Sequence, residues 1–288
     1  MTSLARSFLY VPGNAPDKLE KARGRGADAL IVDLEDAVPV AEKEAARQAV
    51  LGWLADQSAV ETSEGADLWV RVNSGALRES DVVALACAPG LTGLVLAKVA
   101  SAAEVAQVVA LLAAHGDTTT LLSPLIETGA AVLDAAAIAA QQRVHVLQLG
   151  EVDLAGDLGL EPGPDEAELA AQRAQVVIAS AAAGLLSPPG PVSPVIRDLD
   201  WFRTSTERVR RQGFLGRACI HPGQVEVVHQ VFAPSVEEID RAHEVLDLVA
   251  QAEAQGRGVV VDRAGRMLDP AVTRAAHRVL ALAERARA

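Results

Sequence analysis

Two acidic residues that each follow an apolar run could together hold a metal ion. Glu127 comes directly after the run 120–126, and Asp153 follows the next run, 144–149. If these runs are neighbouring parallel strands, the two carboxylates converge, repel one another and raise one another's pKa. A hard divalent cation removes that conflict, and Mg²⁺ typically takes one or two carboxylates with substrate oxygens and waters. The pair predicts a Mg²⁺ site, although each acid could instead be an ordinary loop residue or the partner of an arginine.

Arg71 is the candidate for holding a substrate. It ends the apolar run 68–72 and shares a strand face with Asn73. A planar guanidinium at a strand end suits bidentate capture of a carboxylate. It could instead form a salt bridge to one of the acids in the DLEDA motif at 33–37.

Asp33, Glu35 and Asp36 crowd three acids into four positions at the end of a buried run. Charges so close must be neutralised, and the cations available are Arg6, Arg71 and Lys98. We expect Glu35, Asp36 and Lys98 to form the layer around the metal site, with Asp36 also placed to cap the following helix. His221 ends the last apolar run, and we interpret it as a wall residue rather than a catalytic base.

Elements that could position these residues alternate along the chain. Short apolar runs at 7–11, 29–34, 68–72, 93–99, 120–126, 144–149, 185–186 and 217–220 predict eight strands, of which 185–186 is the weakest. Segments of helical period lie between them, at 16–25, 41–55, 79–86, 102–114, 130–141, 167–183 and 204–212. This alternation predicts an α/β fold, a (β/α)8 TIM barrel over 1–232, with a C-terminal helical extension over 233–288. In such barrels the functional residues lie at the carboxyl ends of the strands, where the acids and Arg71 fall.

Composition excludes several classes of function. The net charge of −12, from 38 acidic and 26 basic residues, argues against a nucleic-acid partner, which needs a concentrated basic surface. No apolar stretch approaches the ~20 residues that a membrane span requires. Cys87 and Cys219 show no metal-ligand spacing, and the N-terminus lacks the features of a secretory signal. We therefore expect a cytoplasmic protein with no membrane partner.

Eight motifs in order give a family resemblance. They are RSFLYVPGN (6–14), DALIVDLEDAV (28–38), RVN (71–73), LAK (96–98), PLIETGAAV (124–132), LGEVDLAGDLG (149–159), CIHPGQV (219–225) and GRMLDPAV (265–272). Together they resemble the citrate lyase β-subunit (CitE-like) family, within the HpcH/HpaI aldolase/citrate lyase group. One departure is visible, because relatives commonly carry Glu-Asp where this chain has Val152–Asp153.

The resemblance implies a Mg²⁺-dependent carbon–carbon lyase that cleaves or forms a 3-hydroxyacyl thioester such as citryl-, malyl- or citramalyl-thioester. The products are an acyl thioester and an α-keto acid, with CoA or an acyl-carrier protein as the thioester carrier. The family is usually a homotrimer, so a homo-oligomer is implied, with the tail over a neighbouring subunit. An aldolase on free pyruvate-like substrates and a non-catalytic assembly subunit are competing interpretations.

Residue by residue, the resemblance assigns the metal to Glu127 and Asp153 and the substrate carboxylate to Arg71. It assigns the catalytic acid/base to Asp269 in the tail. The loop Pro12–Gly13–Asn14 is implied to lie near the phosphopantetheine arm of the thioester.

Overall fold

The computed structural model describes residues 4–58, 65–255, 260–262 and 266–287, and they form two compact units. The first unit spans Ala5–Val231 and contains the large sheet. The second begins at Phe232 and contains the last two helices.

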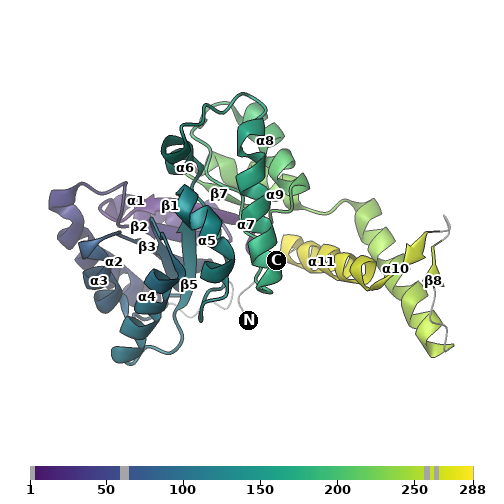
Figure 1. Ribbon diagram of the computed structural model, residues 1–288, viewed down its shortest axis with the longest axis horizontal. Helices are drawn as coiled ribbons and strands as arrows, with labels where there is room; N and C mark the ends of the chain where they lie inside the picture. Colours follow the sequence, from purple (N-terminus) through teal and green to yellow (C-terminus); the bar gives the residue numbers. More distant parts are fainter. Residues whose placement is uncertain (1–3, 59–64, 256–259, 263–265, 288) are drawn as a thin grey trace. The chain divides into compact units, whose positions relative to one another are not determined.

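Seven parallel strands form the sheet of the first unit (Figure 1), in the order β6-β5-β4-β3-β2-β1-β7. Their bounds are β1 Ser7–Pro12, β2 Ala29–Asp33, β3 Asp67–Val72, β4 Gly93–Leu96, β5 Leu121–Ile126, β6 Gln148–Leu149 and β7 Arg217–Cys219. Every residue of β2 and of β4 is buried. Continuous apolar runs of this kind are typical of parallel strands that are covered on both faces.

The helices follow the strands in the alternating order that the sequence predicts. Their bounds are α1 Pro16–Ala22, α2 Lys43–Ser58, α3 Ala76–Leu85, α4 Ala102–Ala114, α5 Gly129–Ala139, α6 Glu151–Leu158, α7 Ala170–Ala182, α8 Leu199–Arg211 and α9 Gly223–Phe232. Short 3-10 turns occur at η1 Arg23–Arg25, η2 Val40–Glu42 and η3 Ala167–Leu169. From α2 to α5 each helix packs against the next one (Figure 1), as in a barrel's outer layer.

The sheet curls strongly. Tyr10 of β1 donates a hydrogen bond from its hydroxyl to Gln148 Oε1 of β6, at 3.3 Å, although four strands separate β1 from β6 in the sheet. An apolar cluster on the concave side includes Phe8, Ile31, Trp69, Val95 and Leu125, from five strands. The carboxyl ends of the strands are therefore gathered around one opening.

The strand predicted at 185–186 does not form. That segment has no ladder, and the position beside β7 is occupied by a single bridge between Gly190 and Arg217. Pro188, Pro189 and Pro191 surround this bridge, and proline cannot donate a ladder hydrogen bond, so the pairing stops at one residue. The first unit thus has a seven-stranded curled sheet with this bridge at its β7 edge.

The second unit consists of α10 Val236–Ala254 and α11 Pro270–Arg287, with the small antiparallel pair β8 Val260–Val261 and β9 Met267–Leu268 between them. Both helices lie within 233–288, the range over which the sequence predicts a helical tail. The buried apolar cluster of this unit joins α10, β9 and α11 and consists of Ala242, Val245, Leu268 and Ala276. Among the residues that the structure describes, no helix has both the length and the apolar character needed to cross a bilayer.

Gly93 tests how tightly the concave face is packed. A Cβ at this position would lie 2.4 Å from the Trp69 ring and 2.6 Å from the Leu121 carbonyl oxygen. We expect Gly93→Ala to lower the free energy of unfolding by about 1–3 kcal/mol through overpacking, measured by urea denaturation. Gly52→Ala is the matched control: this position in α2 has open space around it, and alanine there should be neutral or stabilise by about 0.5–1 kcal/mol. Equal effects of the two substitutions would contradict the packing argument.

Candidate active site

A cavity of about 230 Å³ opens at the carboxyl ends of the strands. Residues from β1, β3, β5 and β6 line it, together with the start of α6, the 189–192 segment and the end of β7. Its charged lining residues are Asp36, Arg71, Glu127, Glu151 and Asp153. The two carboxylates that the sequence nominated as metal ligands therefore face one space.

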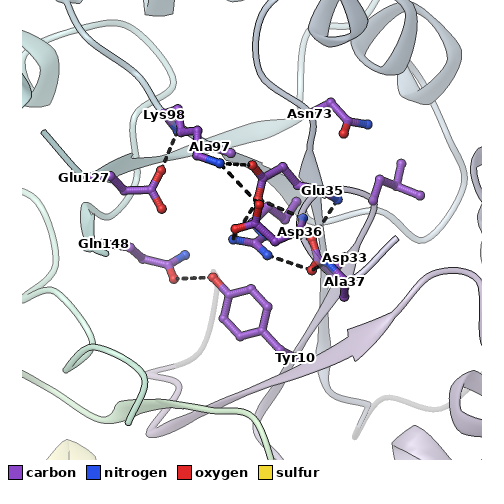
Figure 2. A network of polar contacts seen from close by, with 12 residues as sticks. Tyr10, Asp33, Glu35, Asp36, Ala37, Asn73, Ala97, Lys98, Glu127 and Gln148 are labelled. Carbon is purple, nitrogen blue, oxygen red and sulfur yellow. Dashed lines mark hydrogen bonds and ion pairs between the residues drawn. The ribbon is translucent and has the colours of Figure 1, made fainter. Parts of the chain in front are cut away.

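Glu127 directly follows β5 and is only 2% exposed. The backbone N–H of Lys98 donates to its Oε2 at 2.7 Å (Figure 2). Lys98 has a left-handed backbone conformation with φ 51°, which is uncommon for a residue with a side chain. Gly150 gives the Glu127 side chain its room, because a Cβ there would lie 2.5 Å from Glu127 Cγ and 2.6 Å from Oε1.

Asp153 lies in the first turn of α6, which begins directly after Gly150. Burial and, to a lesser degree, the nearby charge of Asp153 raise the pKa of Glu127 to about 7, against the opposing hydrogen bond from Lys98. The two acids are therefore close enough to repel, as the metal hypothesis requires. Within the described residues, no group of three or more His, Cys, Asp or Glu side chains is arranged to hold a metal, so this pair is the candidate donor set.

Arg71 forms the salt bridge that the sequence left open as one alternative, and it also lies where it could meet a substrate. Its Nε and Nη2 each donate to a carboxylate oxygen of Asp33 at 2.7 Å, and its Nη1 lies 3.1 Å from Glu35 Oε2. At the same time Arg71 lines the cavity, with its guanidinium 5.2 Å from the centre of the Tyr10 ring. Burial lowers the pKa of Arg71, but the hydrogen bonds and charge of Asp33 outweigh it and raise the pKa overall. The salt bridge thus fixes a permanently charged group at the cavity wall.

The DLEDA acids are neutralised by two of the three predicted cations (Figure 2). Lys98 Nζ donates to Glu35 Oε1 at 2.6 Å and to Asp36 Oδ1 at 3.2 Å, while Arg71 holds Asp33. Arg6 takes no part, because its guanidinium binds Asp28 at the opposite, amino-terminal end of the strands.

Asp36 does not cap a helix. The turn η2 begins at Val40 with Pro39 at its N-cap position, so the cap prediction for Asp36 was wrong. The side chain of Asp36 is directed instead to Lys98 and lies 3.6 Å from Arg71 Nη1. The backbone N–H groups of residues 35 and 37 donate to the Asp33 carboxylate, so it is Asp33 that stabilises the turn after β2.

Val152, which stands where relatives commonly carry a glutamate, lies at the wall of the cavity. Val152 is 60% exposed and lines the cavity, whereas the carboxylate one residue earlier, Glu151, turns inward to Arg173. The start of α6 therefore keeps an acid that contacts the protein interior, and it presents an apolar side chain to the cavity next to Asp153.

In the loop Pro12–Gly13–Asn14, the first residue lines a cavity and the other two contact neighbouring segments of the protein. Pro12 lines a second cavity, of about 430 Å³, beside β1, α1 and the residues after β7. Gly13 packs against the Asp33 carbonyl oxygen, where a Cβ would lie at 2.9 Å, and Asn14 donates to Glu42 Oε2 at 2.7 Å. His221 also lines this second cavity, and its Nδ1 accepts from the Gly223 N–H at 3.1 Å.

Asp269 belongs to the second unit, where it precedes α11. Its Oδ1 accepts from the N–H groups of Ala271 and Val272 at 2.8 and 3.0 Å, so the exposed carboxylate caps the helix. Gly265 of the GRMLDPAV motif lies outside the described residues.

Sequence reasoning missed a polar chain on the cavity floor. Tyr10 donates to Gln148 (Figure 2), and Gln148 Nε2 donates to Ser123 Oγ at 2.9 Å. Gln148 and Ser123 are almost fully buried, and burial raises the pKa of the Tyr10 phenol. The available signal was a polar residue inside each of two apolar strands, which an apolar core alone does not explain.

Comparison with known proteins decides the family. The model of the HpcH/HpaI aldolase/citrate lyase family matches residues 6–222. The chain belongs to this family. The resemblance to citrate lyase β-subunits is confirmed as well, since the chain is 32% identical to the citrate lyase subunit beta of Leuconostoc mesenteroides subsp. cremoris, over 97% of this chain and 93% of that one.

One further relative and one solved structure are also similar to the chain. A (3S)-malyl-CoA thioesterase of Cereibacter sphaeroides (strain KD131) is 36% identical over 89% of this chain and 87% of its own length. Among solved structures, the protein CitE from Mycobacterium tuberculosis in complex with magnesium, acetoacetate and coenzyme A superimposes with a TM-score of 0.78. It is 28% identical, and the match covers 99% of this chain and all of that one.

The raised pKa of Glu127 makes a prediction about the metal-free protein. Between the ordinary value of 4.5 and about 7, the folded state holds a proton that the unfolded chain has released. Stability conferred by this group therefore falls as the pH rises through that window. With EDTA present, Glu127→Gln should gain roughly 1–3 kcal/mol relative to the unsubstituted protein between about pH 5 and about pH 8, measured by urea denaturation. A stability difference that does not change with pH would contradict the assignment.

Proposed function

We propose that this protein is a Mg²⁺-dependent carbon–carbon lyase that cleaves or forms a 3-hydroxyacyl thioester, such as a citryl-, malyl- or citramalyl-thioester. The observation that carries the proposal is the convergence of Glu127, Asp153 and Arg71 on one cavity, in a chain of the citrate lyase family. The products would be an acyl thioester and an α-keto acid.

The residues present fit Mg²⁺. The donor set is two carboxylates, which are hard oxygen ligands, and Mg²⁺ in proteins commonly uses one or two of these and fills its other positions with substrate oxygens and waters. Glu127 and Asp153 would hold the ion, and their mutual repulsion favours a divalent cation between them. When bound, Mg²⁺ supplies Lewis-acid polarisation of a carbonyl oxygen.

Arg71 would bind the carboxylate of the keto-acid half. Two of the five guanidinium N–H groups, those on Nε and on Nη2 that bind Asp33, are committed, and the bidentate contact fixes the plane of the group. Nη1 also lies 3.1 Å from Glu35 Oε2, which leaves the second N–H of Nη2 and one N–H of Nη1 for a substrate carboxylate. Lys98 and Glu35 support this arrangement, because Glu35 contacts both cations and holds them beside the cavity.

Asp269 would act as the acid/base of the reaction, from the tail of a neighbouring subunit in a homo-oligomer, for which we propose a trimer. In the cleavage direction the 3-hydroxyl group would give its proton to solvent, the carbon–carbon bond would break to leave the α-keto acid, and protonated Asp269 would transfer a proton to the enolate of the acyl thioester and regain one from solvent. In the synthetic direction the Asp269 carboxylate removes that proton from the thioester methyl group.

A second cavity suits the carrier arm of a thioester. It is lined by Pro12 and by the exposed cations Lys18, Lys21 and Arg25 of α1 and η1, with Asp17 as its acidic residue. Tyr10 and Ile220 line both this cavity and the one that holds Glu127, so the two spaces adjoin. The phosphates of CoA, or of a phosphopantetheine on a carrier protein, would be attracted to these cations.

Thioester hydrolysis is the second candidate, and it is favoured by the 36% identity to a malyl-CoA thioesterase. The same residues would bind the same substrate, but water would attack the thioester carbonyl and the carbon–carbon bond would remain. An aldolase on free keto acids and a non-catalytic assembly subunit are less favoured, because neither function needs the cations of the second cavity.

We also propose that the curled sheet closes as a (β/α)8 barrel, with the 188–190 segment in place of the eighth strand.

The deciding experiment separates these reactions by their products. Purified protein with Mg²⁺ is incubated with malyl-, citramalyl- and citryl-CoA, and the products are identified by mass spectrometry. Acetyl-CoA with a keto acid supports the lyase, whereas free CoA with the intact hydroxy acid supports the thioesterase. Turnover of pyruvate-like substrates without CoA would favour the aldolase, and turnover that is unaffected by EDTA would overturn the metal assignment.

Asp153→Asn removes one proposed metal ligand while it preserves the size of the side chain. We expect Mg²⁺ affinity, measured by calorimetry, and lyase activity to fall at least about 10-fold, because an amide is a poorer ligand for a hard cation than a carboxylate. Asp200→Asn is the control, since Asp200 is likewise an exposed acid in the first turn of a helix, α8, and does not line the cavity. Unchanged Mg²⁺ binding in the Asp153 variant would count against this ligand.

Asp269→Asn separates proton transfer from helix capping. Asparagine caps helices as well as aspartate does, so α11 and the melting temperature should be preserved. We expect kcat to fall by about 10²–10⁴-fold, the range for loss of an acid/base group, with Mg²⁺ affinity unchanged. Exchange of the acetyl-CoA methyl protons with deuterated water should fall in parallel. Full activity in this variant would remove Asp269 from the mechanism.

A further inference from the structure

A buried polar network lies at the place where the sheet is not closed by a strand. Its two ends belong to the two edges of the sheet: Glu151 follows β6, and Arg217 lies in β7. Arg173 of α7 is 0% exposed and Arg217 only 1%, and both rank among the largest fully buried side chains. Buried guanidinium groups are uncommon unless they are paired, so their partners indicate what they position.

Arg173 forms a bidentate salt bridge with Glu151, the first residue of α6. Its Nε and Nη2 donate to the two carboxylate oxygens of Glu151 at 2.5 and 2.8 Å, a bidentate contact that is short on both arms. Such a contact fixes the orientation of the carboxylate as well as its position. Because Glu151 and Asp153 lie in the same first turn, a fixed Glu151 also fixes the backbone from which the Asp153 carboxylate extends.

The network continues from Arg173 to the opposite wall of the cavity. Arg173 Nη1 donates to Glu166 Oε2 at 3.1 Å, and Glu166 also accepts from Ser205 Oγ at 2.9 Å. Arg217 Nη1 donates to the same Ser205 hydroxyl at 3.0 Å, and its Nε donates to the Pro191 carbonyl oxygen at 3.0 Å. Pro191 lines the cavity, so one chain of contacts holds both sides of the gap.

The backbone at the start of α6 is poorly constrained by its own sequence, and the Arg173–Glu151 contact offsets this. Residue 150 must be glycine because Glu127 occupies the space of a Cβ, and glycine confers the greatest backbone freedom of any residue. Gly150 makes no side-chain cap for α6. The first turn of α6 is held by its two buried side chains, Glu151 and Leu154, and of these Glu151 makes the directional polar contact.

We propose that Arg173 is a positioning residue for the metal site: through Glu151 it fixes the first turn of α6 so that Asp153 faces Glu127 across the cavity. This inference rests on the proposed Mg²⁺ site for its functional consequence. Arg173 touches neither the metal ligands nor the cavity. Its contribution is the geometry of a ligand, and that geometry exists before the ion binds.

Arg173→Met tests the proposal, because methionine keeps an unbranched side chain and removes all five donors. We expect the Mg²⁺ dissociation constant, measured by calorimetry, to rise about 10-fold, the lower end of the range for loss of a direct partner of a metal ligand, because Arg173 acts on Asp153 through Glu151. Arg173→Lys retains the charge and should recover part of the affinity. In metal-free protein, amide hydrogen exchange at residues 152–154 should accelerate in the methionine variant.

Arg143→Met is the matched control. Arg143 also pairs with a buried acid, Asp117, but neither residue lines the cavity. We expect this variant to lose melting temperature with no change in Mg²⁺ affinity. A merely structural role for Arg173 predicts the same pattern for Arg173→Met, so a folded Arg173→Met protein with Mg²⁺ affinity within about 2-fold of the unsubstituted protein would overturn the proposal.

Two further outcomes remain decisive. If Arg173→Met does not fold, two single variants replace it, Glu151→Gln and Arg173→Lys. Each of them weakens the bidentate contact without leaving an apolar group against a buried charge. If the unsubstituted protein binds no Mg²⁺, the proposed function fails. Amide exchange at residues 152–154 then decides the positioning role by itself, and unchanged exchange in the variants would overturn it.

Discussion

The negative charges gathered at the carboxyl ends of the strands are the constraint on which the rest of this structure depends. Asp33, Glu35, Asp36, Glu127 and Asp153 all lie at the carboxyl ends of the strands, and two cations, Arg71 and Lys98, form ion pairs with the first three. A carboxylate removed from water is stable only with a partner. The pairing of the first three acids therefore leaves Glu127 and Asp153 as a site where repulsion persists and where a divalent cation is favoured.

The same pairing explains why Arg71 can serve a substrate. A guanidinium that was free to move would lose side-chain entropy whenever it bound a carboxylate. Asp33 holds two of its nitrogen atoms, and Glu35 lies beside the third, so the group is already fixed and charged when a ligand arrives. From the sequence, the salt bridge and substrate binding looked mutually exclusive, but in this geometry the salt bridge prepares the binding group.

Local pattern was sufficient to predict most of this arrangement. The alternation of apolar runs with helical segments predicted the parallel sheet, and the polar residue after each run predicted the end of the sheet at which the site lies. The helix α6, which carries Asp153, was missed although Gly150, Glu151 and Gly159 give start and stop signals for it. Gln148 and Ser123 could not be assigned, because their pairing depends on how far the sheet curls, and that is set by contacts distant in sequence.

The strand prediction at 185–186 failed for a reason that bears on function. A proline-rich segment cannot add a full ladder to β7, so a gap in strand pairing remains between β6 and the single Gly190 bridge at the β7 edge. Closing the gap with strand hydrogen bonds would place a continuous ladder where Pro191 and the start of α6 now line the cavity. Hydrogen bonds from Glu151 through Arg173, Glu166 and Ser205 to Arg217 bridge the gap instead. Of the residues in this chain of contacts, Glu151 lines the cavity and Arg173, Glu166, Ser205 and Arg217 do not, so the contacts can fix the wall beside Asp153 without filling the space in front of it.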